Sequence, residues 1–180
     1  MSLEQNIKVA VDAVVFGYDN KSLSLLVIER KHPDEKKKWA LPGGFVEEDE
    51  NLERAAKREL QEETNLSLSH LQQFHTFGAV DRDRRGRIIS VAHLVLVNKA
   101  KRKVRSGDDA KDVKWIPISM LPKLAFDHNE IVAKAIDVLR GKIASLTTDC
   151  VEDIPSTADI KLMSSQLKEE LKEELKEKRT

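Results

Sequence analysis

The chain has 180 residues, and its 31 basic and 31 acidic side chains give a net charge of zero. Hydrophobic residues make up 40% of the sequence, which is enough for a packed core and excludes a disordered chain. The zero net charge argues against a protein whose main task is to coat nucleic acid. The length predicts one domain with an extension.

The sequence contains a single cysteine, Cys150, so no disulfide can form within one chain. No apolar run approaches the length that spans a membrane, and the N-terminal residues lack the apolar segment of a signal peptide. We therefore expect a soluble cytoplasmic protein without a membrane partner. Cys150 lies in a polar stretch with no histidine nearby in sequence, which favours a passive thiol over a nucleophile.

The first third of the chain predicts a β-hairpin that is followed by a glycine turn. Residues 7–18 and 23–30 have the composition of strands, and a cluster of turn residues joins them. The apolar run at 25–28 predicts burial on both faces. We interpret the charged loop at 32–38 as solvated rather than phosphate-steering. After a short extended segment at 39–41, the residue pair Gly43-Gly44 lets the backbone turn and approach a ligand closely.

Residues 51–64 predict a helix with an acidic inner face, and Asn51 is its candidate N-cap. Residues at helical spacing form an inward apolar stripe: Leu52, Ala55, Ala56 and Leu60. Glu59 and Glu63 fall on the same face as this stripe, with Glu62 at its edge. The outward face carries the remaining side chains: Glu53, Arg54, Lys57, Gln61 and Thr64.

Carboxylates that crowd a partly buried face repel one another, and burial makes each charge costlier. Hard divalent cations with oxygen ligands relieve this repulsion, and magnesium typically keeps waters and meets substrate phosphates. Arg58 lies four residues before Glu62 and can hold one carboxylate in place. A solvated helix laced with salt bridges is the alternative. The coincidence of the apolar stripe with the carboxylates argues against it.

The residues around this helix also follow a fixed spacing. Five residues separate Gly44 from Glu50, and seven more lead to Arg58-Glu59-Leu60-Gln61-Glu62-Glu63-Thr64-Asn65-Leu66. This pattern resembles the Nudix box, in which the same spacing leads to Arg-Glu-aliphatic-x-Glu-Glu-x-Gly-aliphatic. The one departure is Asn65 in place of the final glycine, and asparagine tolerates a left-handed helix cap. The resemblance extends from about Lys8 to Gly141, because the flanking stretches resemble members that act on ADP-ribose.

The resemblance implies a Nudix hydrolase of the ADP-ribose pyrophosphatase-like subgroup. It implies an α/β fold of the Nudix α/β/α sandwich type, with a mixed sheet. The implied ligands of one or more Mg²⁺ ions, with Mn²⁺ as a substitute, are Gly43 (through its carbonyl), Glu59, Glu62 and Glu63. Arg58 would orient the glutamates, and Gly44 would approach the substrate. The expected reaction is hydrolysis of the diphosphate bond in a nucleoside diphosphate linked to another moiety.

The identity of the general base stays open. Some relatives use a glutamate from a downstream loop, but no glutamate occurs between Glu63 and Glu130. We therefore expect Glu59 to serve as the base. The alternatives are the aspartates of two loops: Asp81, Asp83, Asp108 and Asp109.

Residues 81–87 form a polar loop with four arginines. Guanidinium groups match phosphate oxygens bidentately, so the loop is a candidate anion clamp. An exposed turn whose charges pair among themselves is the alternative. ADP-ribose-type family members carry a similar RDxRGR segment, which favours Arg82 and Arg84 as substrate-binding or structural residues.

The rest of the chain predicts strands at 71–80, 88–97 and 113–118, and then a second helix at 127–140 that Gly141 closes. Pro117 indicates that the last strand lies at an edge of the sheet. We interpret His93 as a hydrogen-bonded sheet histidine rather than a catalytic one. Whether His128 meets a ligand or only decorates the first turn of the helix stays open.

We divide the chain into a Nudix hydrolase domain (1–142), a linker (143–156) and a charged C-terminal helix (157–180). This helical extension carries a narrow apolar stripe: Ile160, Met163, Leu167, Leu171 and Leu175. Three interpretations of the stripe stay open: docking on the domain, pairing in a homodimer, and a lone solvated helix.

ADP-ribose is the first small-molecule substrate we expect, with AMP and ribose 5-phosphate as products. Oxidised nucleoside triphosphates, dinucleoside polyphosphates and nucleotide sugars are alternatives. The competing class is an ADP-ribose-sensing Nudix module without turnover, which regulates genes through a C-terminal winged-helix domain. Residues 142–180 are too few and too rich in lysine and glutamate for such a domain, so we favour catalysis and expect no nucleic-acid partner.

Overall fold

The computed structural model describes residues 6–19, 22–31, 39–107, 110–145, 149–153 and 155–177, with side chains described as far as residue 169. The predicted solvated loop at 32–38 lies outside the described residues. The same holds for two candidate bases, Asp108 and Asp109, and for the side chains of Leu171 and Leu175 in the predicted apolar stripe.

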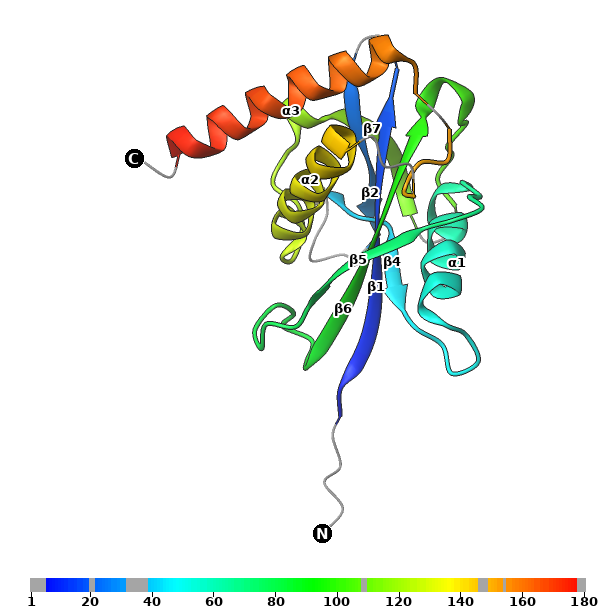
Figure 1. The fold of residues 1–180 in the computed structure, drawn as a ribbon. Helices are drawn as coiled ribbons and strands as arrows, with labels where there is room; N and C mark the ends of the chain where they lie inside the picture. The colour runs from blue at the N-terminus through cyan, green and yellow to red at the C-terminus, as the bar shows by residue number, and fades with distance from the viewer. Residues whose placement is uncertain are drawn as a thin grey trace.

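Seven strands form one mixed sheet in the part of the chain that the structure describes (Figure 1). They are β1 (Lys8–Tyr18), β2 (Leu23–Arg30), β3 (Trp39–Ala40), β4 (Gly43–Phe45), β5 (Gln72–Phe77), β6 (Ile88–Asn98) and β7 (Ala110–Pro117). The central order is β3-β2-β1-β6-β5, with β4 paired to β1 and β7 paired to β2. Strands β1 and β6 run parallel along their whole length, whereas the other pairs are antiparallel. The prediction of a mixed sheet is confirmed.

The strand boundaries differ from the predicted ones by more than one residue in two places. The strand predicted for residues 71–80 ends at Phe77, and the one predicted for 113–118 begins three residues earlier, at Ala110. The predicted hairpin is confirmed, since Phe16 pairs with Leu25 and Tyr18 with Leu23. Residues 23–28 of β2 are all buried, as the apolar run predicted.

Helices cover both faces of the sheet, so the predicted α/β/α sandwich is confirmed (Figure 1). Helix α1 (Leu52–Thr64) covers one face, and α2 (His128–Ser145) and α3 (Thr157–Glu177) lie on the other. Alternation along β1 supplies both cores. Val11, Ala13 and Val15 pack with α1. Val14 and Phe16 belong to the cluster that contains α2.

Helix α2 does not end at Gly141 as predicted but continues to Ser145. Ile143, in the added turn, packs against the main core, and this packing offsets the cost of a glycine in a helix interior. The Ser145 hydroxyl donates a hydrogen bond to the Gly141 carbonyl at 2.9 Å. Tertiary packing therefore overrides the stop signal that the glycine gives.

We expect the substitution Gly141→Ala to stabilise the protein. Nothing lies within 4 Å of the position that a Cβ would take at Gly141. Alanine is more favourable than glycine in a helix interior, so the free energy of unfolding should rise by about 0.5–1 kcal/mol. The midpoint of thermal unfolding should then rise by about 1–4 °C, measured by circular dichroism. A lower midpoint would contradict a continuous helix through residue 141.

The C-terminal segment is bound to the domain. The Leu96 N–H donates to the Cys150 carbonyl at 2.8 Å, and the Glu152 N–H donates to the Leu96 carbonyl at 3.0 Å, so this segment continues the pairing of β6. Met163 and Leu167 of α3 are buried in the main core. This finding selects docking for the first part of the C-terminal helix, while the predicted domain boundaries stay predictions. No helix within the described residues is long and apolar enough to cross a membrane.

Candidate functional site

Two asparagines fix the ends of α1, the helix that carries the candidate glutamates. Asn51 is the N-cap, and its side-chain oxygen accepts a hydrogen bond from the Arg54 N–H at 2.9 Å. Asn65 has a left-handed φ of 55°, and its N–H donates to the Gln61 carbonyl at 2.9 Å. Both predicted caps are confirmed, and Asn65 adopts the conformation for which the family uses glycine.

The predicted outward position of Thr64 is wrong, because a downstream segment covers the end of α1. Thr64 is fully buried, and its hydroxyl donates to the Leu60 carbonyl at 2.6 Å. The N–H groups of Arg105 and Gly107 donate to the carbonyls of Thr64 and Glu63. These bonds satisfy carbonyls that a helix end leaves without intrahelical partners.

Arg58 forms ion pairs with three glutamates at the candidate site. Its guanidinium contacts Glu50 at 2.6 Å, Glu59 at 2.9 Å and Glu62 at 3.1 Å, and it donates to the Phe45 carbonyl at 3.0 Å. The Glu50 side chain is 2% exposed, and its hydrogen bond to Arg58 holds the pKa of Glu50 below its usual range. Arg58 therefore connects the loop before α1 with three carboxylates.

Glu59 is pressed against the backbone of Gly44. A Cβ at Gly44 would lie 2.2 Å from Glu59 Oε1, so the two groups fit only because residue 44 has no side chain. The Glu59 side chain is 15% exposed, and burial raises its pKa even though Arg58 opposes the shift. The charged form of Glu59 is thus incompletely compensated by its neighbours.

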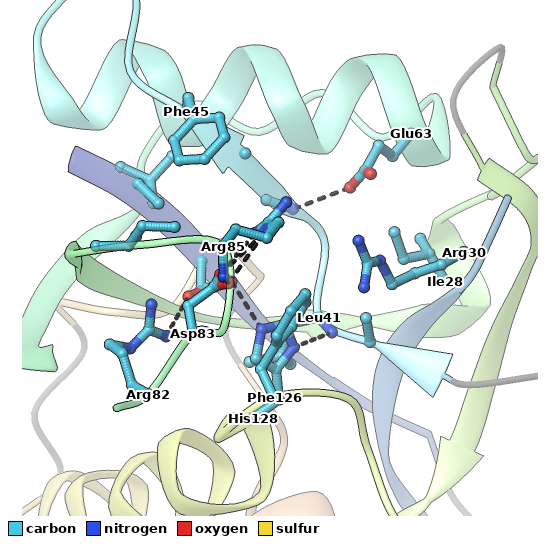
Figure 2. A pocket seen from close by; sticks show the side chains of 17 residues that line it. Ile28, Arg30, Leu41, Phe45, Glu63, Arg82, Asp83, Arg85, Phe126 and His128 are labelled. Atoms are coloured by element: carbon cyan, nitrogen blue, oxygen red, sulfur yellow. Dashed lines mark hydrogen bonds and ion pairs between the residues drawn. The ribbon is translucent and has the colours of Figure 1, made fainter. Parts of the chain in front are cut away.

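Glu63 lies one turn further along the same face of α1 and is 8% exposed. Its Oε2 accepts a hydrogen bond from the Gly43 N–H at 2.9 Å (Figure 2). The helix thereby brings Glu59 and Glu63 to adjacent residues of β4. Glu62 differs from both in its exposure, because its side chain is 48% exposed, although it contacts Arg58 as Glu59 does.

The residue types beside β4 fit a hard divalent cation, since Glu59 and Glu63 bring carboxylate oxygens to Gly44 and Gly43. Among the described residues, no group of three or more His, Cys, Asp or Glu side chains is placed to hold a metal ion. Glu59 and Glu62 are held by Arg58, and Glu63 is held by the Gly43 N–H. A cation that binds there must draw carboxylates away from these partners.

A cavity of about 120 Å³ opens beside Glu63, Gly43 and Gly44 (Figure 2). Pockets for drug-sized ligands usually have about 300–1,000 Å³. This cavity can therefore enclose one part of a nucleotide derivative while the rest lies along the surface. Its other lining residues include Asp12, Arg30, Leu41, Phe45, Arg82, Asp83, Arg85, Phe126 and His128.

A buried polar network centred on Asp12 lies at the wall of this cavity. Asp12, in β1, is 6% exposed and accepts a hydrogen bond from the Ser90 hydroxyl. His128 Nε2 lies 3.4 Å from Asp12 Oδ1, and the Arg82 guanidinium lies 3.7 Å from Oδ2. Sequence reasoning missed Asp12. The available signal was a carboxylate inside an otherwise apolar strand, because a buried charge needs partners.

His128, whose role the sequence left open, is a buried member of this network and is 5% exposed. Its Nδ1 accepts a hydrogen bond from the Leu41 N–H at 2.9 Å. An accepting Nδ1 carries no proton, so the imidazole is neutral, with its proton on Nε2 facing Asp12. Burial lowers the pKa of His128, which agrees with the neutral form. His128 thus braces the backbone that leads into Gly43.

We expect mild acid to destabilise the protein through His128. The pKa of His128 in the folded protein lies below its ordinary value of 6.5, so the unfolded chain binds the proton more readily. The contribution of neutral His128 to the free energy of unfolding is therefore present above about pH 6.5. It is lost as the pH falls through the pKa that His128 has in the folded protein.

The variant His128→Asn keeps an acceptor near the position of Nδ1 for the Leu41 N–H and cannot be protonated in this range. Its thermal midpoint should fall less between pH 7 and pH 5 than that of the wild type. His93 is also buried and has a lowered pKa, so the thermal midpoint of the variant should still fall to some extent between pH 7 and pH 5. The control is His70→Gln, because the His70 side chain is 54% exposed. An equal fall of the thermal midpoint from pH 7 to pH 5 in His128→Asn and the wild type would contradict the assignment.

The arginines of the loop at 81–87 have different roles. The Arg82 side chain is 4% exposed and pairs bidentately with Asp127 at 2.6 and 2.8 Å, so it ties the loop to the start of α2. Arg85 binds Asp83 at 2.7 Å and lines the cavity. Arg84 is exposed and is not among the residues that line the cavity. The structure therefore brings Arg82 and Arg85 to the site, and sequence reasoning did not single out Arg85.

Two of the remaining candidate bases are unfavourably placed. Asp81 is exposed and does not line the cavity. Burial alone would raise the pKa of Asp83, but its hydrogen bonds and charge pairing with Arg85 hold that pKa below its usual value. His93 is 1% exposed, and its Nδ1 lies 3.1 Å from the Val91 carbonyl, which confirms the interpretation as a sheet histidine.

The α/β/α fold and the packing of the glutamates of α1 against the two glycines of β4 define the class of this protein. The family model described as NUDIX domain matches residues 6–135. The chain therefore belongs to the NUDIX family and is a Nudix hydrolase, as the sequence predicted.

Three known proteins show how close the similarity is. The chain is 42% identical over 134 residues to the ADP-ribose pyrophosphatase of Methanocaldococcus jannaschii, and the match covers 74% of each chain. It is 35% identical over 136 residues to the ADPR responsive transcriptional repressor NtrR of Acinetobacter baylyi, covering 73% of this chain and 54% of the repressor. The solved NUDIX domain of Shewanella oneidensis NrtR, complexed with ADP ribose, superimposes with a TM-score of 0.69 at 32% identity, covering 76% of this chain and 90% of that domain.

Proposed function

We propose that the protein hydrolyses the diphosphate bond of ADP-ribose and releases AMP and ribose 5-phosphate. The observation that carries this proposal is the packing of two glutamates of α1 against β4: Glu63 and Gly43 line the cavity together, and Glu59 packs against Gly44 from outside the cavity lining. The choice of substrate is supported by two similar proteins, an ADP-ribose pyrophosphatase and a NUDIX domain with bound ADP ribose.

Mg²⁺ is the proposed cofactor, with Mn²⁺ as a substitute. The residues that would hold the ion are Glu59, Glu62 and Glu63, together with the carbonyl of Gly43. When bound, such an ion neutralises the diphosphate charge and lowers the pKa of an attacking water. Arg58 orients the glutamates, because its guanidinium contacts both Glu59 and Glu62.

Glu59 is the proposed general base. Its carboxylate is shielded from solvent and packs against Gly44, which lines the cavity. Asp83 is a weaker candidate, because its pKa is lowered and both its carboxylate oxygens accept hydrogen bonds from the Arg85 guanidinium.

The two arginines predicted to bind substrate have different support. Arg82 lines the cavity, but its bidentate pair with Asp127 favours a structural contribution. Arg84 would meet only a part of the substrate that extends beyond the cavity, since it is exposed.

An ADP-ribose-binding regulatory module without turnover is the second candidate. The similarity to an ADPR responsive repressor favours it, although the match spans about half of that protein. Arg58 contacts Glu59 and Glu62, two of the proposed metal ligands, and this arrangement also suits a site that binds ADP-ribose without cleaving it. The two candidates differ in whether bound ADP-ribose is cleaved.

A substrate panel separates these functions. The full chain is incubated with ADP-ribose, a nucleotide sugar, a dinucleoside polyphosphate and an oxidised nucleoside triphosphate, each with Mg²⁺ and with a chelator. We expect the highest kcat/KM for ADP-ribose, with AMP and ribose 5-phosphate released in equal amounts. Calorimetric binding of ADP-ribose without product would establish the regulatory module instead. A higher kcat/KM for the triphosphate would overturn the substrate assignment.

The cytoplasm is the proposed location, and the lone, buried Cys150 supports it, because a reducing compartment needs no disulfides. The homodimer stays a prediction, and light scattering on the full chain measures it.

A further inference from the structure

The last turn of α1 carries two of the proposed metal ligands, Glu62 and Glu63, because the helix ends at Thr64. The last four carbonyls of a helix have no partner within the helix, and helix ends fray readily. The order of this turn therefore depends on what its carbonyls contact. The same contacts decide how firmly the backbone of both glutamates is held.

A segment that follows β6 supplies most of these contacts. The Arg105 N–H donates to the Thr64 carbonyl at 3.0 Å, and the Gly107 N–H donates to the Glu63 carbonyl at 3.1 Å. Gly107 also packs directly against the Glu62 carbonyl, since a Cβ at residue 107 would lie only 1.6 Å from the Glu62 oxygen. The segment thus reaches the end of the helix because position 107 has no side chain.

Two side chains hold residues 105–107 in this position. Val104 packs against the apolar cluster that contains Leu60 of α1. Asn65 Nδ2 donates a hydrogen bond to the Arg105 carbonyl at 3.3 Å. Asn65 is the one departure from the Nudix box pattern, and the family's glycine has no side chain with which to make this bond.

A capping role alone does not explain an asparagine at position 65. Glycine ends a helix in the left-handed conformation without the steric cost that a side chain brings. The Asn65 amide instead reaches a residue that lies 40 positions downstream. It therefore joins the end of α1 to the segment that satisfies the carbonyls of Glu63 and Thr64.

We propose that Asn65 is a positioning residue for the metal ligands Glu62 and Glu63. Its side-chain amide ties residues 105–107 to the end of α1, and these residues keep the last turn of the helix ordered. Ligands that are held in place before an ion arrives lose less conformational freedom when it binds, so the affinity for the ion rises. The proposal rests on the metal site of the proposed function, which it extends to a residue outside that site.

The test is a titration of the full chain with Mn²⁺, in which the free ion is measured by electron paramagnetic resonance. The variant Asn65→Gly removes the amide and keeps the left-handed cap. Gly107→Ala drives residues 105–107 away from the helix through the clash with the Glu62 carbonyl. The control is Gly78→Ala, because nothing lies within 4 Å of a Cβ there and Gly78 does not line the cavity.

A second readout, amide hydrogen exchange of residues 60–65 without metal, reports the order of the last turn directly. Exchange should be faster in Asn65→Gly and Gly107→Ala than in the wild type, and unchanged in Gly78→Ala. The thermal midpoint of Asn65→Gly should stay within a few degrees of the wild type, because the helix cap is kept. A residue that served only as a cap would leave exchange unchanged in this variant.

We expect Asn65→Gly to weaken Mn²⁺ binding about 2- to 10-fold, the range for one exposed hydrogen bond. Gly107→Ala should weaken it about 10- to 100-fold, as is typical when a group that orients metal ligands is displaced. Gly78→Ala should bind Mn²⁺ as the wild type does.

Wild-type Mn²⁺ affinity in Asn65→Gly would overturn the proposal, and so would weaker binding without faster exchange. Either result leaves the proposed function intact, because the wild type still binds the ion. Absence of Mn²⁺ binding by the wild type would overturn the proposed metal site and this inference together.

Discussion

The variant Glu63→Gln should lose Mg²⁺-dependent hydrolysis of ADP-ribose while it keeps its fold. Its amide oxygen can still accept the hydrogen bond that Glu63 Oε2 takes from the Gly43 N–H at 2.9 Å, so the contact between α1 and β4 survives. The substitution removes one negative charge from the proposed cation site. Metal stabilisation of a transition state is worth several kcal/mol, so we expect kcat to fall at least about a hundredfold.

Glu53→Gln is the matched control for this experiment. Glu53 lies on the outer face of the same helix, is 41% exposed and pairs with Lys57 at 2.9 Å. A surface pair of this kind contributes little stability, and we expect the control to keep wild-type kcat. Activity of Glu63→Gln within about tenfold of the control would show that Glu63 is not needed for the metal.

The variant Gly44→Ala should lose most of its activity with little loss of stability. The new Cβ would lie 2.2 Å from Glu59 Oε1, and the carboxylate can rotate away because it ends a flexible side chain. The substitution should therefore displace the Glu59 carboxylate and leave the backbone in place. Misplacing a catalytic group by about 1 Å can cost a hundredfold in rate, and we expect a loss of kcat of at least that size.

Gly78→Ala controls for the replacement of a glycine that does not line the cavity. Nothing lies within 4 Å of a Cβ at Gly78, which follows β5, so kcat and the thermal midpoint should stay close to wild type. For Gly44→Ala we expect a thermal midpoint within a few degrees of the wild type. Wild-type kcat in Gly44→Ala would show that the approach of Glu59 to residue 44 is irrelevant to catalysis.

Local patterns predicted the helix α1 well, because its signals lie next to one another in the chain. The cap residues Asn51 and Asn65 act on their own helix, and both occupy the predicted positions. Thr64 could not be placed in this way, because the segment at Arg105–Gly107 buries it from a distant part of the sequence. The end of α2 was missed for a similar reason, since packing of Ile143 decides it.

The acidic helix of the candidate site was predictable, but much of the surrounding cavity was not. Glu59 and Glu63 share one face through helical spacing, which the sequence shows directly. The contacts of Asp12 with Ser90 and His128 join three elements whose approach depends on the sheet order. The ring of Phe126 reaches the cavity through a single left-handed residue, which no periodic pattern signals.

The most direct measurement is the release of AMP from ADP-ribose as a function of Mg²⁺ concentration, compared between the wild-type chain and Glu59→Gln. If the buried carboxylates beside β4 hold the ion and take the proton, the wild type should show saturable Mg²⁺ dependence. Its activity should vanish with a chelator, and Glu59→Gln should be at least about a hundredfold slower at every Mg²⁺ concentration. AMP release that is equally fast in the chelator, or equally fast in Glu59→Gln, would contradict the assignment of this helix as the catalytic centre.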